Sequence, residues 1–350
     1  MAAPLGRVRL ALDAMGGDHG ATEVVPGGIA WADENPDDEL ILVGDESVIH
    51  QITRGKLPAN ARIVHGPDVI GMDEHPAQAL RERKGASILV ATNLVREGVA
   101  DAVVTAGHTG AGMAAAVLRL GRLPGVDRPA LAVQFLLREK PLVLLDVGAN
   151  PDATSENLYQ YAHMGSIFSE HVLGVSNPRV ALLSIGEEKG KGDQRIQKAT
   201  ELLDSAELNF TGNVEGRHLA ADEADVVVCD AVLGNVSIKL VEGVTTTITD
   251  MFREEFRRLP FGPLAAILMR PAITRIRTKL DYERIGGAVL LGVKGSVVIT
   301  HGRARKRMVT FACGTAARTV REGVSGRIAR SLAGAPPVTL DGLPSGPAPD

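Results

Sequence analysis

The feature that most constrains this fold is a repeated order of a short apolar run, a glycine-containing loop and a helix-length segment. The apolar runs that we predict to be strands are Val8–Asp13, Glu39–Val43, Ala61–His65, Ala102–Thr105, Pro141–Asp146, Val180–Ile185 and Asp225–Cys229. The helical segments between them include Ala86–Glu97, Ser155–Leu173 and Asp193–Leu203. Continuously apolar strands that alternate with helices are typical of a mainly parallel sheet covered on both faces. The sequence therefore predicts an α/β protein.

Composition indicates the material of the core and the extent of the domain. Aromatic residues make up 3% of the 350-residue chain and hydrophobic residues 45%, so the core must be built from Val, Leu, Ile and Ala. We expect a single α/β domain over residues 1–332, which is long enough to bury a substantial core. Residues 333–350 are rich in Pro and Gly, and we predict that they form a disordered tail.

Charge and cysteine content exclude several classes of protein. A net charge of −4 argues against a nucleic-acid partner. Cys229 and Cys313 lie far apart and in no metal-ligand spacing, so we predict no metal site and reduced thiols. No signal peptide is apparent, and no apolar run approaches the ~20 residues that span a bilayer. We expect a cytoplasmic protein that is soluble or lies on a membrane surface.

The segment 252–282 interrupts the alternating pattern. It has no strand signal, it contains three prolines, and it carries seven Arg or Lys against three Asp or Glu. Its apolar residues recur at helical spacing, which predicts a projecting pair of short amphipathic helices. Leu264, Ile267 and Leu268 would contact an anionic membrane surface, a dimer partner or both.

The best candidate for a phosphate site is the glycine-rich turn after the strand Ala102–Thr105. Gly107 and Gly110 leave backbone N–H groups accessible, Thr109 adds a hydroxyl, and an alanine-rich helix follows. A helix N-terminus favours anions. The pattern is neither a Walker loop nor a dinucleotide fingerprint, so it does not imply a nucleotide. A plain tight turn is the alternative.

Polar side chains in other loops extend this candidate site. They are Asp13, Asp18 and His19 in residues 10–20, Lys189 and Lys191 in residues 182–199, and Asp230, Asn235 and Lys239 in residues 226–243. In parallel sheets, ligands bind beyond the carboxyl ends of the strands, where we expect these loops to lie. The two lysines of 182–199 would neutralise a phosphate. We expect Asp230 and Asn235 in a turn, with Lys239 one helical turn further on. Capping carboxylates and solvated loops are the competing interpretations.

A basic cluster precedes the helix that begins near Ser87. Arg81, Arg83 and Lys84 would meet an acidic partner or a phosphate, or form a solvated helix face. The chain contains no G-x-S-x-G nucleophile elbow, no H-E-x-x-H motif and no Cys in a His-paired signature. An acyltransferase of this sequence would therefore lack an obvious protein nucleophile.

These loops, taken in order, resemble the acyl-ACP:phosphate acyltransferases of bacterial phospholipid synthesis, the PlsX family. The matching segments are LDAMGGD, HPAQALRERKGAS, VVTAGHTGAGM, RPAL, LLDVGAN, MGSIFSE, NPRVALLSIGEEKGKG, VVVCD followed by GNVSIKLVEG, and GGAVLLGVKGSVVITHG. They span residues 8 to 302. The resemblance implies a Rossmann-like three-layer α/β/α homodimer without a cofactor.

The resemblance also implies a reaction. A long-chain fatty acyl group moves from acyl carrier protein to inorganic phosphate, and a membrane glycerol-3-phosphate acyltransferase receives the acyl phosphate. The protein would work at the inner face of the cytoplasmic membrane. Phosphate is a competent nucleophile and a thiolate leaves readily, so direct attack needs positioning and electrostatics more than an enzyme nucleophile. His19, His108 and His301 are the candidates for a general base.

The sequence departs from the family pattern in two loops. Family members usually have Asn where this chain has His108, and usually Gly-Phe-Thr in the loop that is Ala231, Val232 and Leu233 here. These departures keep open a catalytically degenerate scaffold that docks on a membrane. Two further enzyme classes stay open: a phosphate acetyl- or butyryltransferase that uses acyl-CoA, and a metal- and NAD-dependent decarboxylating dehydrogenase.

Overall fold

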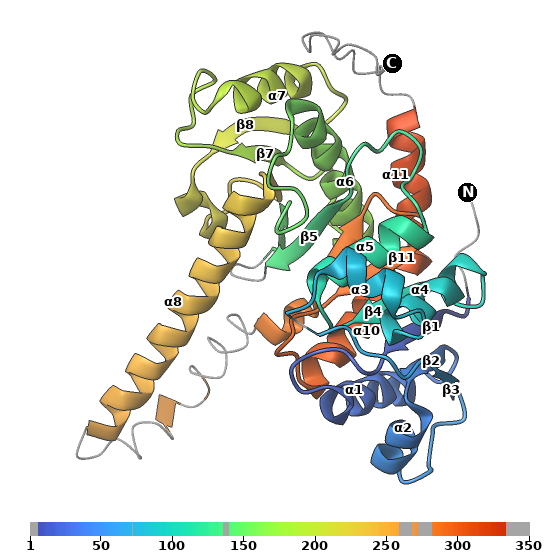
Figure 1. Cartoon of the computed structure of the whole chain (residues 1–350). Coiled ribbons are helices and arrows are strands. Elements are labelled where there is room, and N and C mark those ends of the chain that lie inside the picture. The colour runs from blue at the N-terminus through green and yellow to red at the C-terminus, as the bar shows by residue number, and fades with distance from the viewer. Residues whose placement is uncertain are drawn as a thin grey trace, which may run out of the picture.

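A single mixed sheet organises the chain (Figure 1). The computed structural model describes residues 6–71, 73–135, 140–258, 268–269, 271 and 282–333. The strands are β1 (Arg9–Asp13), β2 (Glu39–Gly44), β3 (Ala61–His65), β4 (Ala102–Thr105), β5 (Ala130–Phe135), β6 (Leu142–Leu145), β7 (Val180–Leu183), β8 (Phe210–Val214), β9 (Val226–Val228), β10 (Ala288–Leu291) and β11 (Ser296–Ile299). They pair in the order β3-β2-β1-β4-β11-β10-β5-β6-β9-β7-β8.

The sheet consists of two parallel halves joined by an antiparallel centre. Strands β3, β2, β1, β4 and β11 run in one direction. Strand β10 is antiparallel to β11 and β5, and β5 is antiparallel to β6. The half formed by β6, β9, β7 and β8 is again parallel but runs opposite to the first. The mainly parallel α/β sheet predicted from the sequence is therefore confirmed, with a central reversal.

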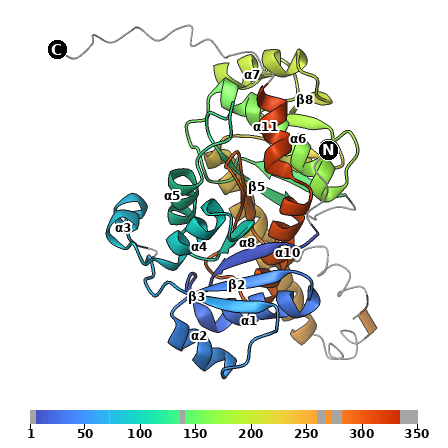
Figure 2. The ribbon, with the colours of Figure 1, turned by 90° about the vertical axis from the view of Figure 1, so that its right-hand side faces the viewer.

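Helices cover the sheet on both faces (Figure 2). The helices are α1 (Ala21–Glu34), α2 (Glu46–Thr53), α3 (Pro76–Glu82), α4 (Ser87–Arg96), α5 (Thr109–Arg119), α6 (Ser155–Leu173), α7 (Gln194–Asp204), α8 (Ala231–Arg258), α10 (Lys306–Arg321) and α11 (Val324–Ala333), with a short 3₁₀ turn η2 (Tyr282–Ile285). One core layer contains apolar residues of α1, α6, α10 and α11, and the other those of α3, α4 and α5. Aliphatic side chains dominate both layers, as the composition predicted.

The predicted strands are all present, some with ends one or two residues away from the predicted positions. The helix Ser155–Leu173 has the predicted bounds. The sequence analysis did not identify β5, β8, β10 and β11. Strands β10 and β11 have four residues each. The periodicity of so short an apolar run cannot distinguish a strand from a segment of a buried helix.

We predicted a separate pair of helices that starts at residue 252, and this starting point was wrong. Residues 252–258 are the end of α8, one continuous helix that starts at Ala231. Asn235 consequently lies on this helix rather than in a turn. Helix α8 extends away from the body of the molecule (Figure 1). Leu264 and Ile267 lie outside the described residues, as does the tail 334–350, whereas Leu268 is described and is 73% exposed.

Protonation of His163 on α6 is expected to destabilise the fold at low pH. Burial lowers the pKa of His163 to about 4, and within the described chain its Nε2 has no hydrogen-bond partner. Because the unfolded histidine titrates near pH ~6.5, this contribution to the unfolding free energy is present above that pH. It is lost as the pH falls toward 4, by on the order of 3 kcal/mol.

Chemical denaturation of the wild type and of His163→Met, at neutral pH and at about pH 4, tests this prediction. We expect the free energy of unfolding to fall by less in the variant. An equal fall in both proteins would contradict it.

Candidate active site

The buried carboxylate of Asp13 connects the loops that follow β1 and β4. Ser87 Oγ donates to Asp13 Oδ1 at 2.5 Å and Thr105 Oγ1 donates to Oδ2 at 2.6 Å. Thr105 Oγ1 in turn accepts from the N–H of Gly107 at 2.9 Å. Burial raises the pKa of Asp13, and the two hydroxyl donors oppose that shift. Asp13 is 2% exposed, and through Thr105 it holds the glycine-rich turn in place.

His108 caps the N-terminus of α5. Its Nδ1 accepts from the N–H groups of Gly110 at 3.0 Å and Ala111 at 3.4 Å. Acceptance at Nδ1 assigns the proton of the neutral ring to Nε2. The His108 ring therefore accepts hydrogen bonds from the first turn of the helix, as the side-chain oxygen of an N-cap asparagine does in other helices. In the described part of the chain the backbone N–H groups of His108 and Thr109 have no acceptor, so this turn retains two donors.

A cavity of about 540 Å³ lies next to this turn, over the antiparallel centre of the sheet. Its floor is formed by Leu131 and Val133 of β5, Ala288 of β10 and Ile299 of β11. The polar part of its wall combines segments that are distant in sequence: Thr109, Gly148, Asn235, Lys239, Glu242, Thr300 and His301. The sheet reversal thus brings the two halves of the chain to one cavity.

Lys239 and His301 lie together on one side of the cavity, where Lys239 supplies the positive charge. Lys239 Nζ lies 3.0 Å from His301 Nε2 and 3.2 Å from Glu242 Oε2. The N–H of Arg303 donates to His301 Nδ1 at 3.1 Å. Burial lowers the pKa of His301, and the charge of Lys239 lowers it further. Both ring nitrogens of His301 thus face an N–H donor, and because a neutral ring accepts at only one nitrogen, the tautomer decides from which of the two donors it accepts.

Asp146 organises the loop that supplies Gly148 to the cavity, a role that the sequence analysis did not assign. Its buried carboxylate accepts from the N–H groups of Leu131, Gly148, Ala149 and Asn150 at 2.7 to 3.1 Å. Burial raises the pKa of Asp146, whereas these N–H groups lower it. The available signal was an aspartate directly after an apolar strand and before a glycine.

The structure brings together only part of the predicted set. Lys189 is 77% exposed and pairs with Asp204 at 2.8 Å, and neither Lys189 nor Lys191 lines the cavity. Asp230 caps α8 through the N–H of Leu233 and lies 3.4 Å from Arg195. Asn235 and Lys239 line the cavity.

The remaining predicted residues surround the cavity or lie apart from it. Asp18 and His19 are exposed, and the N–H of Asp18 donates to Gly302 O at 2.7 Å. Arg83 pairs with Glu74 at 3.0 Å, and Arg81 and Lys84 are exposed at the end of α3.

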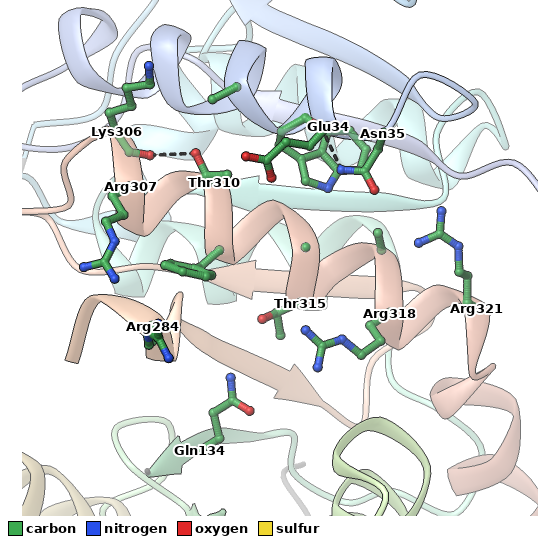
Figure 3. Close-up of a pocket in the computed structure, with 15 residues that line it drawn as sticks. Glu34, Asn35, Gln134, Arg284, Lys306, Arg307, Thr310, Thr315, Arg318 and Arg321 are labelled. Carbon is green, nitrogen blue, oxygen red and sulfur yellow. Dashed lines mark hydrogen bonds between the residues drawn. The ribbon is translucent and has the colours of Figure 1, made fainter. Parts of the chain in front are cut away.

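A second cavity of about 700 Å³ lies between α1 and α10 (Figure 3). Basic side chains dominate its wall: Arg284, Lys306, Arg307, Arg318 and Arg321. Part of this charge is neutralised, because Arg321 pairs with Asp38 at 2.5 Å and Arg307 with Glu283 at 3.0 Å. The cavity contains none of the predicted site residues.

Within the described residues there is no group of three or more His, Cys, Asp or Glu that could hold a metal ion. In the same part of the chain, no helix has the length and apolar character needed to cross a membrane. Cys229 is buried, and burial raises the pKa of its thiol well above the usual range. It does not line the 540 Å³ cavity.

Comparison with known proteins identifies a family whose members are similar to this chain over most of its length. A family model described as "Fatty acid synthesis protein" matches residues 8–327. The phosphate acyltransferase of Desulfitobacterium hafniense (strain DSM 10664 / DCB-2) is 46% identical over 327 residues, which cover 93% of this chain and 98% of the relative. That of Heliobacterium modesticaldum is 47% identical, covering 91% of this chain and 94% of the relative.

Among solved structures, a phosphotransacetylase from Streptococcus pyogenes superposes with a TM-score of 0.60 at 17% identity, covering 91% of this chain and 95% of that one. The EutD phosphotransacetylase from Staphylococcus aureus has a TM-score of 0.58 at 17% identity, with coverages of 90% and 94%. At this identity the similarity describes the fold.

Proposed function

Because this chain belongs to the phosphate acyltransferase family of fatty acid and phospholipid synthesis, we propose that its phosphate binds between Lys239, His301 and the N-terminal turn of α5. The observation that carries this proposal is the approach of Lys239 Nζ to His301 Nε2 at 3.0 Å. In the tautomer that we propose, Nδ1 of His301 accepts from the N–H of Arg303 and Nε2 carries the proton. Two N–H donors therefore face each other, and a phosphate oxygen would accept from both.

The reaction that fits this site is direct attack of a phosphate oxygen on the carbonyl carbon of an acyl thioester. A C–O bond forms, the C–S bond breaks, and the leaving thiolate takes up a proton from the phosphate or from water. The free backbone N–H groups of His108 and Thr109 would donate to the oxyanion of the tetrahedral intermediate. The partial positive charge of the helix N-terminus would add to this stabilisation. His19 remains a candidate for a general base, whereas in this tautomer both ring nitrogens of His301 are engaged. His108 is held by its capping hydrogen bonds.

The experiment that tests the function is trapping of the product. Purified protein is incubated with palmitoyl-acyl carrier protein and phosphate, and hydroxylamine converts any acyl phosphate to a hydroxamate. We expect a hydroxamate that requires phosphate and the long-chain donor. Product from acetyl-CoA alone would favour a short-chain transferase, and no product from any donor would favour a degenerate scaffold.

We propose acyl carrier protein as the donor because exposed basic side chains lie at α3 and in the groove along α5. Arg81 lies one helical turn after Ala77, which lines a cavity along α5, and Lys84 follows it. Arg122 and Arg128 line the same cavity. An acidic carrier would gain association rate from this charge.

Reversing the charges at Arg81 and Lys84 is expected to lower kcat/KM for the carrier-linked donor by about tenfold at low salt, and by less as salt screens the charges. The same acyl group on coenzyme A should react at an unchanged rate. The matched control is Arg54→Glu with Lys56→Glu, an equal charge change at exposed positions beyond α2. Equal losses for both donors would oppose a docking role.

We further propose that the protein is a homodimer that associates peripherally with the inner face of the cytoplasmic membrane. It would deliver acyl phosphate there to a glycerol-3-phosphate acyltransferase. Helix α8 supports this, because it exposes an apolar series that includes Val236 (57% exposed), Leu240 (64%) and Val244 (47%). Leu268 and Met269 are also exposed, at 73% and 48%. Exposed apolar surface of this extent favours a partner or a membrane.

Changing Leu264, Ile267 and Leu268 to Asp is expected to lower flotation with anionic liposomes by about tenfold or more, since three apolar side chains lose favourable burial. Changing Val244 and Ile248 to Asp is the matched variant on α8, where we expect loss of the dimer in analytical ultracentrifugation. Unchanged flotation of the first variant would refute membrane contact at its three positions.

A further inference from the structure

Helix α5 carries an apolar face that the rest of the protein covers only in part, since Met113 and Ala114 are half-buried and Val117 and Leu118 are exposed. Its inner face, Ala111, Gly112, Ala115 and Ala116, is buried in the core. A second stripe lies on the other side at helical spacing and consists of Gly110, Met113, Ala114, Val117 and Leu118. Leu118 is 65% exposed and Val117 37%. Surface helices normally present polar side chains outward, but α5 has no charged residue before Arg119.

This stripe forms one wall of a groove of about 690 Å³. The opposite wall is Ala77 of α3, residues 127–129 and the Ala149–Asn150 pair, and Leu290 of β10 lies at its floor. The groove adjoins the reaction cavity. Gly110 and Ala149 line the groove, and their chain neighbours Thr109 and Gly148 line the cavity. A molecule that reacts at the turn would therefore have the groove beside it.

The far end of the groove is polar. Arg122 NH1 lies 3.5 Å from Asp127 Oδ1, and Asp127 Oδ2 accepts from Asn157 Nδ2 at 2.9 Å. An apolar chain that extended past this ion pair would bury no further apolar surface. Between the turn and the pair runs the length of α5, about 16 Å for an eleven-residue helix.

We infer that this groove binds the acyl chain of the donor, with the thioester at the N-terminus of α5 and the chain lying along Met113, Ala114 and Val117 toward Arg122. The inference rests on the proposed acyl transfer and adds a position for the chain. The position beside the reaction cavity, the apolar stripe and the polar end together select a linear acyl chain as the occupant. The side chains of the stripe then set the preferred chain length.

Substitution of Ala114 by Phe tests the inference, because it fills the groove close to the turn. Each methylene moved from water to an apolar groove improves binding by about fourfold. We expect kcat/KM for a palmitoyl donor to fall by tenfold or more, which corresponds to about two methylenes left in water. The value for a butanoyl donor, whose chain ends before Ala114, should stay within about twofold of wild type.

Leu118→Asp provides a second variant at an exposed position near the far end, where folding is not in question. It should lower kcat/KM for the palmitoyl donor and spare the octanoyl and dodecanoyl donors, so that the chain-length limit follows position along α5. Ala59→Phe, the same substitution in an exposed turn before β3, is the matched control and should leave the profile unchanged.

Unchanged chain-length profiles in folded, active Ala114→Phe and Leu118→Asp proteins would overturn the inference. An equal fall in kcat/KM for every acyl donor in both variants would also overturn it, because the groove residues would then support the turn before α5 and would not bind the acyl chain. If the wild type forms no acyl phosphate from any donor, the failure lies with the proposed function, and the two failures are thus distinguishable.

Discussion

Replacing Lys239 with alanine is expected to lower kcat/KM for phosphate by a factor on the order of a hundred to a thousand, the usual effect of removing one preorganised donor from a developing anion. The physical reason is the apposition of Lys239 Nζ and His301 Nε2 at 3.0 Å beside the cavity. Without the ammonium group, phosphate would keep one donor on this side and lose its main charge partner. Lys239→Arg should recover part of the loss, because it restores the charge with a different geometry.

Steady-state kinetics with varied phosphate measure this effect. Lys189→Ala is the informative comparison, since the sequence predicted Lys189 as a phosphate ligand but the structure pairs it with Asp204 at 2.8 Å. We expect Lys189→Ala to change kcat/KM by less than about threefold, as a surface ion pair contributes little. A larger loss in Lys189→Ala than in Lys239→Ala would reverse the assignment and return phosphate to the loop before α7.

Substitution of Gly234 by alanine is the second change with a large expected effect. A Cβ atom on Gly234 would lie 1.9 Å from the carbonyl oxygen of Asp146 and 3.1 Å from Cys229 Sγ. The start of α8 would have to move away from the loop after β6, which should lower the free energy of unfolding by on the order of 3 kcal/mol. Asn235 and Lys239 would move with the helix, and a displacement of about 1 Å in a reactive site costs about a hundredfold in rate.

Gly243 on the same helix provides the control. A Cβ atom there would meet nothing within 4 Å, so Gly243→Ala should stabilise the protein by up to about 1 kcal/mol through helix propensity. Thermal unfolding and the hydroxamate assay measure both variants. Wild-type stability and activity in Gly234→Ala would show that α8 does not depend on its contact with Asp146.

Much of the fold followed from local patterns. Val180–Leu183 and Ala102–Thr105 are buried throughout, and continuously apolar strands between helices specify a covered parallel sheet. The glycine-rich turn before α5 was also readable, because glycines, a capping residue and an alanine-rich helix are adjacent in sequence. Helix α8 was misjudged because Gly234 and Gly243 weaken helix propensity, whereas the close approach to Asp146 requires the first of them.

The grouping of the site residues depends on long-range pairing. Local sequence could place Asp13, Gly107 and Lys189 near strand ends and Lys239 one helical turn beyond another, but it could not rank the two lysines, and it did not identify the strand before His301. Their ranking follows from the antiparallel strands β10 and β5, which reverse the sheet and bring α8 against the end of β11. Hydrogen bonds between strands far apart in the chain set that reversal, and four-residue runs carry no signal for it. The motifs therefore contained the chemistry of phosphate acyl transfer, whereas strand pairing selected Lys239 and His301 to meet at the cavity.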